Sequence, residues 1–165
     1  MRNLYLLNVT IHVLAAMLWL GGMFFLAVVG APVLRSIDPP ELRARLFGRI
    51  GRQFRAVGWI AIAMLVATGI GNLAFAGALR GDAILHAEMW STPYGHALAW
   101  KLASVLAMVG VSAMHDFWLG PRAGRLAAGS PDALRARRWA SWLARINALL
   151  GIAIVAAAVR LARGG

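Results

Sequence analysis

Four long apolar runs dominate the chain, at residues of about 4–34, 56–79, 95–120 and 139–162. Each run exceeds the roughly 20 residues that a helix needs to cross the hydrocarbon core of a bilayer. The runs lack the alternation of apolar and polar residues that marks the strands of a membrane barrel. Backbone groups must be satisfied internally in lipid, which favours helices. The pattern therefore predicts an all-α integral membrane protein, a four-helix bundle forming one transmembrane domain over residues 1–165.

The segments between the runs differ in charge. Six basic residues lie in Arg35–Arg55 and five in Arg122–Arg138, whereas four others lie near the ends and in the middle loop (Arg2, Arg80, Arg160, Arg163). The positive-inside rule then predicts that the first and third loops are cytoplasmic and that both termini are outside. In the first loop, apolar residues follow Asp38–Glu41 at helical spacing among arginines. This pattern predicts a short amphipathic helix on the membrane surface.

Composition narrows the class of protein. The 165 residues are 61% hydrophobic with a mean hydropathy of +0.69, and we read the first apolar run as a helix because it is longer than a signal-peptide core. The absence of cysteine excludes disulfides, iron–sulfur clusters and c-type haem attachment, but it allows haem b. The net charge of +11 is concentrated in loops, so we expect contact with anionic lipid and no nucleic-acid partner. We expect a multi-pass protein of the cytoplasmic (inner) membrane.

Ionisable residues occur inside the third run. Lys101 and His115 are fourteen residues apart, which is close to four helical turns, so both point the same way about 21 Å apart. Such groups are costly in a membrane helix and usually face a bundle interior, a water cavity or a ligand. We expect His115 and its neighbours to be structural or proton-handling groups near the cytoplasmic face, together with Ser112, Asp116 and Arg145.

A second polar group is predicted in the outer third of the membrane. When the helices are laid in alternating directions, His12, Asn72 and Lys101 come from three helices at similar depth, with His96 nearby. Asn8, His12, Ala15 and Trp19 share one face of the first helix, and Gly21 and Gly22 leave room for a flat ligand near Trp19. Ordinary interhelical hydrogen bonds and a snorkelling lysine are the structural alternatives.

The outer loop offers a different chemistry. His86 and Met89, taken with His96 and His12, supply the imidazole and thioether groups that suit copper. Their spacing matches no strong metal motif, and a solvated loop with aromatic interface anchors explains the same residues.

Three short motifs resemble a known family. They are His12-x6-Trp19-x-Gly21-Gly22, Thr68-Gly69, and Tyr94-Gly95-x5-Lys101-Leu102. Together they resemble the CopD-type (copper resistance D) membrane domain, which implies a four-helix membrane scaffold. The His-x6-Trp pattern with a lysine in the third helix also resembles the HemJ-type protoporphyrinogen oxidases, which are four-helix haem b proteins. That second resemblance implies functional roles for His12 and Lys101.

Three hypotheses follow. The first is a haem b protein with a redox or haem- or metal-handling function, which in one form is a haem-dependent membrane oxidoreductase. His12 would be the axial ligand, and His96, Lys101 or water would be trans to it. Asn72 and Trp19 would lie beside the ring. A quinone or another redox membrane protein would be its partner. The second is a CopD-like copper transport or resistance protein. The third is a cofactor-free assembly subunit, and homo-oligomers are compatible with each hypothesis.

The topology prediction can be tested with reporter fusions. A fusion at Gly165 should report an outside location and a fusion near Gly129 a cytoplasmic one, because eleven basic residues lie in the two Arg-rich loops. A cytoplasmic signal at Gly165 would contradict the prediction.

Overall fold

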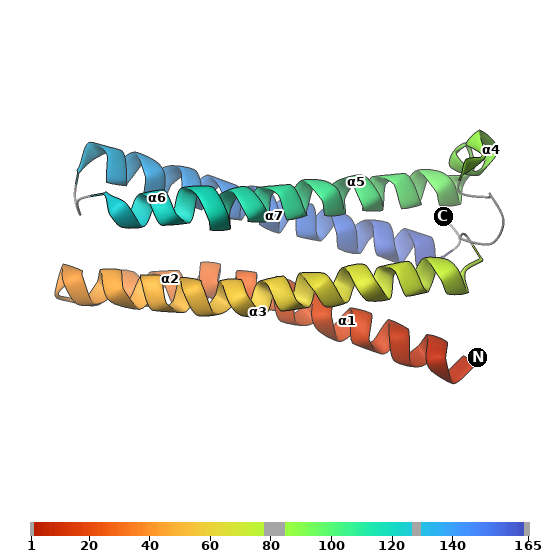
Figure 1. Ribbon diagram of the computed structural model, residues 1–165, viewed down its shortest axis with the longest axis horizontal. Coiled ribbons are helices and arrows are strands. Elements are labelled where there is room, and N and C mark those ends of the chain that lie inside the picture. The colour runs from red at the N-terminus through yellow and green to blue at the C-terminus, as the bar shows by residue number, and fades with distance from the viewer. Residues whose placement is uncertain (1, 78–84, 127–129, 164–165) are drawn as a thin grey trace. The chain divides into compact units, whose positions relative to one another are not determined.

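A computed structural model describes residues 2–77, 85–126 and 130–163, and every regular element among them is a helix (Figure 1). The prediction of an all-α membrane protein is confirmed in these residues. Four helices are long and apolar enough to cross a membrane: Arg2–Arg35, Pro40–Phe75, Pro93–Arg122 and Arg138–Ala162. The chain divides into two compact units, Met1–Gly81 and Asp82–Gly165, and each is described by itself.

The first unit is a hairpin of two long helical rods. The first rod consists of α1 (Arg2–Phe25), a π-helical turn (Leu26–Gly30) and α2 (Ala31–Arg35), and the second rod is α3 (Pro40–Phe75). In Figure 1, α3 runs back alongside α1. The expected surface helix of the first loop is not separate, since it forms the beginning of the 36-residue α3. No proline interrupts this helix after its first residue, so the arginine-rich turns continue into the apolar ones.

Glycines let α1 and α3 approach closely. A Cβ atom added at Gly58 would lie 3.6 Å from the Trp19 indole, which is ordinary van der Waals contact. A Cβ atom at Gly22 would overlap the Phe54 ring. Each helix therefore places an aromatic ring over a glycine of the other, and Trp19 is buried there. Close packing over small residues is the usual means of association between membrane helices.

The second unit is also a hairpin. Thr92 fixes the start of its first rod, because its hydroxyl accepts a hydrogen bond from the Gly95 N–H at 2.9 Å. The returning helix begins at Pro131. The elements of the second unit, in chain order, are α4 (Ala87–Trp90), α5 (Pro93–Ala113), a π-helical turn (Met114–Leu119), α6 (Gly120–Arg125) and α7 (Pro131–Ala162).

The two units repeat one plan. Each has a long helix, a π-helical turn, a short helix carrying a proline and a long returning helix. The prolines are Pro32 and Pro121, 89 residues apart. Near the start of the returning helices, Leu-Arg-Ala-Arg occurs at 42–45 and again at 134–137, which are 92 residues apart. Further along the same helices, Ile-Ala-Ile occurs at 60–62 and 152–154, again 92 residues apart. These registers give the equivalent positions of the two hairpins.

Large apolar side chains point outward from both units. Met17, Val28 and Leu106 are 65%, 69% and 74% exposed. A water-soluble protein rarely exposes so much contiguous apolar surface, whereas membrane helices present it to lipid. These faces and the four apolar helices make the chain a multi-pass membrane protein. The single transmembrane domain, its orientation and the choice of membrane stay predictions.

Two neighbouring glycines offer a matched test of helix packing. Gly22→Ala should lower the free energy of unfolding by about 1–3 kcal/mol, because the new methyl group displaces the Phe54 ring. Gly21→Ala should be neutral or slightly stabilising, since no atom lies within 4 Å of its added Cβ. Unfolding in detergent followed by circular dichroism measures both. Equal effects of the two substitutions would contradict this account of the α1–α3 contact.

Candidate functional site

Four polar side chains meet between α1 and α3, and we call them the α1–α3 polar cluster: Asn8, His12, Thr68 and Asn72. Asn8 Nδ2 donates hydrogen bonds to Asn72 Oδ1 and to the Thr68 carbonyl oxygen, both at 2.9 Å. His12 Nδ1 lies 2.7 Å from Thr68 Oγ1. Thr68 is buried and the other three are half-buried. The cluster thus joins the two helices of the first unit through side-chain hydrogen bonds.

The placement of the cluster follows from helical periodicity. Asn8 and His12 lie one turn apart on the predicted face of α1, and this face does pack on α3, with Ala15 and Trp19 buried beyond them. Thr68 and Asn72 are likewise one turn apart on α3. An amide or imidazole in an apolar setting is costly unless it is hydrogen-bonded, so these groups pair with each other.

Glycines provide the space that the cluster occupies. A Cβ atom at Gly71 would lie 2.7 Å from Asn8 Oδ1, closer than real Cβ atoms approach. A Cβ atom at Gly69 would lie 3.7 Å from His12 Cε1. The Thr68-Gly69 pair therefore has two roles, since the threonine bonds the imidazole and the glycine beside it gives the ring room.

The Thr68 hydroxyl determines how His12 presents its ring. Thr68 Oγ1 donates to the Met64 carbonyl oxygen at 2.6 Å. A hydroxyl carries one proton; with that proton directed to the Met64 carbonyl oxygen, we assign the short contact to an Nδ1–H of His12 that donates to Oγ1. The lone pair of the neutral imidazole is then on Nε2. Metal-binding histidines are commonly oriented in this way, through a hydrogen bond from the other ring nitrogen.

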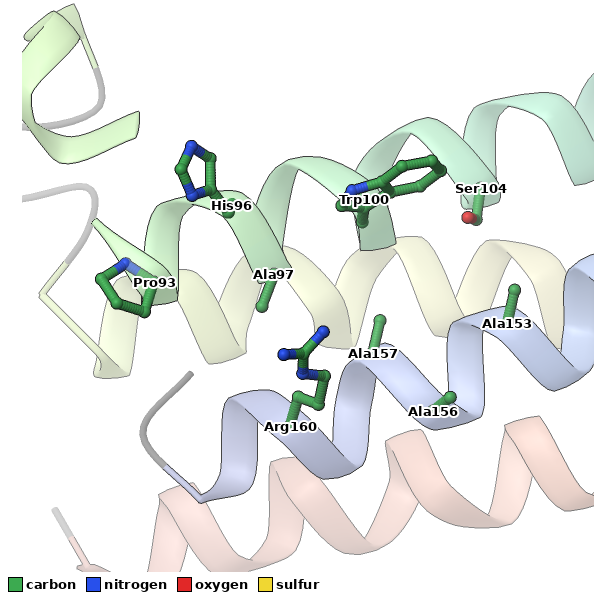
Figure 2. A pocket seen from close by; sticks show the side chains of 9 residues that line it. All are labelled: Pro93, His96, Ala97, Trp100, Ser104, Ala153, Ala156, Ala157 and Arg160. Atoms are coloured by element: carbon green, nitrogen blue, oxygen red, sulfur yellow. The ribbon is translucent and has the colours of Figure 1, made fainter. Parts of the chain in front are cut away.

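The other residues of the predicted outer site lie in the second unit. Lys101 is half-buried on α5, and its position relative to His12 stays a prediction. His96 is exposed in the first turns of α5, where it lines a groove together with Trp100 and Arg160 (Figure 2). Of the predicted outer site, only His12 and Asn72 are placed in one cluster among the described residues of the first unit. They do not bond each other, since His12 contacts Thr68 and Asn72 accepts a hydrogen bond from Asn8.

The outer-loop donors are placed as follows. His86 is exposed immediately before α4, and Met89 is half-buried within it. In residues 2–77, 85–126 and 130–163, no three histidine, aspartate or glutamate side chains gather in a way that could hold a metal ion. The predicted role of these residues as copper donors therefore stays a prediction.

The predicted inner group separates into two pairs within one helical segment and one hydrogen bond between helices. His115 Nδ1 lies 2.9 Å from Asp116 Oδ1 within the π-helical turn. Ser112 Oγ accepts a 2.8 Å hydrogen bond from Asn147 Nδ2, and both residues are buried. The Arg145 guanidinium lies over the ring of the tryptophan three residues before it, 5.4 Å from the centroid. Sequence reasoning missed Asn147 as a partner, although an amide in an apolar helix is itself a signal of an interhelical bond.

The cluster can be tested by its contribution to stability. Asn8→Leu removes two interhelical hydrogen bonds and should lower the free energy of unfolding by about 1–2 kcal/mol. Thr10→Val is the control on the same helix, because the exposed Thr10 hydroxyl bonds only the Leu6 carbonyl of its own helix. Its effect should stay below about 0.5 kcal/mol. Denaturation in mixed micelles compares the two, and a control as damaging as Asn8→Leu would contradict the role of the cluster.

A relative spans almost the whole chain. An uncharacterized protein of Aquifex aeolicus (strain VF5) is 32% identical over 165 residues, covering 99% of this chain and 97% of the relative. No solved structure matches.

The family described as copper resistance protein D (CopD) matches residues 48–161, from within α3 to the end of α7. This match bears out the first resemblance, whereas the HemJ resemblance stays an expectation. Asn72, His96 and Lys101 lie inside the matched range, and His12 and Trp19 precede it. The family description names copper, so the expectation of haem b, with its oxidoreductase role, gains no support. The chain belongs to the CopD family of copper resistance proteins.

Proposed function

We propose that this protein handles copper ions at the membrane, and that the ion binds Nε2 of His12 during its passage. Family membership is the observation that carries the choice of copper, since the CopD match extends over residues 48–161. Copper is here the substrate that is moved or held, in keeping with a resistance function. The finer assignment of transport and of the binding residue is our inference.

The chemistry of the α1–α3 polar cluster supports His12 as the binding residue. Imidazole is a good ligand for copper, and His12 is half-buried within an apolar helix pair. Its Nδ1–H is directed to Thr68, which fixes the ring and puts the basic lone pair on Nε2. A ligand on a membrane helix whose ring is already oriented pays less conformational entropy when it takes up an ion.

The second unit supplies further donors of the kind that copper accepts. His96, His86 and Met89 all lie close to the end of the unit at which α4 and α5 begin. We propose that they collect copper at this membrane boundary.

The test is copper uptake into proteoliposomes, with the ion kept as Cu(I) by ascorbate. His12→Gln should lower the initial uptake rate at least about tenfold, because it removes the ligand. Thr68→Val should weaken uptake by about tenfold or less, because it releases the ring from its orientation while leaving the imidazole. His115→Gln is the control, since His115 pairs with Asp116 in another polar group.

Each outcome has a stated meaning. Uptake by His12→Gln at the wild-type rate would remove His12 from the site, and loss only in His115→Gln would mean that the wrong polar group was chosen. A wild-type protein that moves no copper but shows a haem Soret band would replace the copper proposal with haem b. A colourless protein that neither moves nor binds copper would leave the assembly-subunit reading.

A further inference from the structure

A groove of about 620 Å³ lies between α5 and α7 of the second unit (Figure 2). It begins where α5 starts and α7 ends, so it opens at one membrane boundary. Cationic and aromatic side chains occupy this end, and alanine side chains line the space between the helices. The lining includes His96, Ala97, Trp100, Ala153, Ala157 and Arg160.

The internal repeat explains why this space is open. By the register of the two prolines, Ala97 takes the position that Asn8 has in the first unit. By the register of the repeated Leu-Arg-Ala-Arg, Arg160 takes the position of Thr68. The positions of Asn8 and Thr68 are therefore occupied in the second hairpin by a methyl group and a cation, while the His12 position is Lys101, which does not line the groove. The groove is a specific departure from the shared plan.

The charge at the groove mouth lacks a counterpart within the described part of the chain. There, neither a hydrogen bond nor an ion pair holds the Arg160 guanidinium. His96 lies on the facing helix, and Trp100 is 73% exposed beside it. Arginine and tryptophan at a membrane boundary are typical of contact with lipid head groups, and a guanidinium binds phosphate through two parallel hydrogen bonds.

We propose that this groove binds an anionic phospholipid, with the phosphate at Arg160 and His96 and an acyl chain along the alanine side chains. Arg160 and Ala153 are seven residues apart, so the apolar lining extends about 10 Å inward. A free phosphate would fill only the mouth of a 620 Å³ space. A phospholipid, unlike a free phosphate, would place its phosphate at the cation and its acyl chain against the apolar lining. This site shares His96 with the proposed copper-collecting residues, whereas Arg160 and the alanine lining belong to the groove alone.

Lipid binding is measured on the full-length protein in neutral detergent, by native mass spectrometry and thermal unfolding. Dioleoyl phosphatidylglycerol should bind and raise the unfolding temperature, whereas dioleoyl phosphatidylcholine and glycerol 1-phosphate should not. Arg160→Gln should weaken phosphatidylglycerol binding about five- to tenfold. Arg163→Gln is the matched control, because Arg163 is exposed near the same helix end and does not line the groove.

A second variant keeps the charge and fills the space. Ala153→Leu should also weaken phosphatidylglycerol binding, because the larger side chain occupies the acyl position while Arg160 remains. Equal losses in Arg160→Gln and Arg163→Gln would overturn the proposal in favour of general surface attraction. An unfolding shift of equal size with glycerol 1-phosphate would overturn it in favour of a phosphate site. Unchanged phosphatidylglycerol binding in Ala153→Leu would show that the acyl chain does not lie in the groove, and this would overturn the proposal.

Discussion

The hydrogen bond between His12 and Thr68 is the interaction on which the first unit depends. It joins α1 to α3, and the Thr68 hydroxyl in turn donates a hydrogen bond to the Met64 carbonyl oxygen. Structure and chemistry are coupled at this point, since the bond that holds the helices also selects the ring nitrogen that carries the lone pair. Asn8 and the glycines of α3 are arranged around it.

The two hairpins show how one plan can serve different chemistry. In the first unit, the space between the rods is filled by hydrogen-bonding side chains over glycines. In the second, alanines leave the equivalent space open, and the interhelical bond moves along the rods to Ser112 and Asn147. The helices provide the same scaffold twice, while a few substitutions at equivalent positions decide whether the interface is closed or forms a groove.

The sequence predicts the helices well because lipid imposes strong constraints on length and polarity. It also predicts that Asn8, His12 and Trp19 share a face, since periodicity alone determines this. It could not predict that the arginine-rich segment is continuous with α3. The change from polar to apolar residues suggests a boundary, but no proline lies there to end the helix. Partner choice was equally hidden, since depth in the membrane placed Asn72 near His12 but could not assign Thr68 to the imidazole.

The π-helical turns at Leu26–Gly30 and Met114–Leu119 have a consequence for how such a chain can change in length. A π-helical turn holds one residue more than an α-helical turn, so it absorbs an insertion locally. The residues before it keep their rotation about the axis, and the face that packs on the partner helix is preserved. Both hairpins therefore have a π-helical turn at the equivalent position, where the rod can gain or lose a residue without turning its buried face toward lipid.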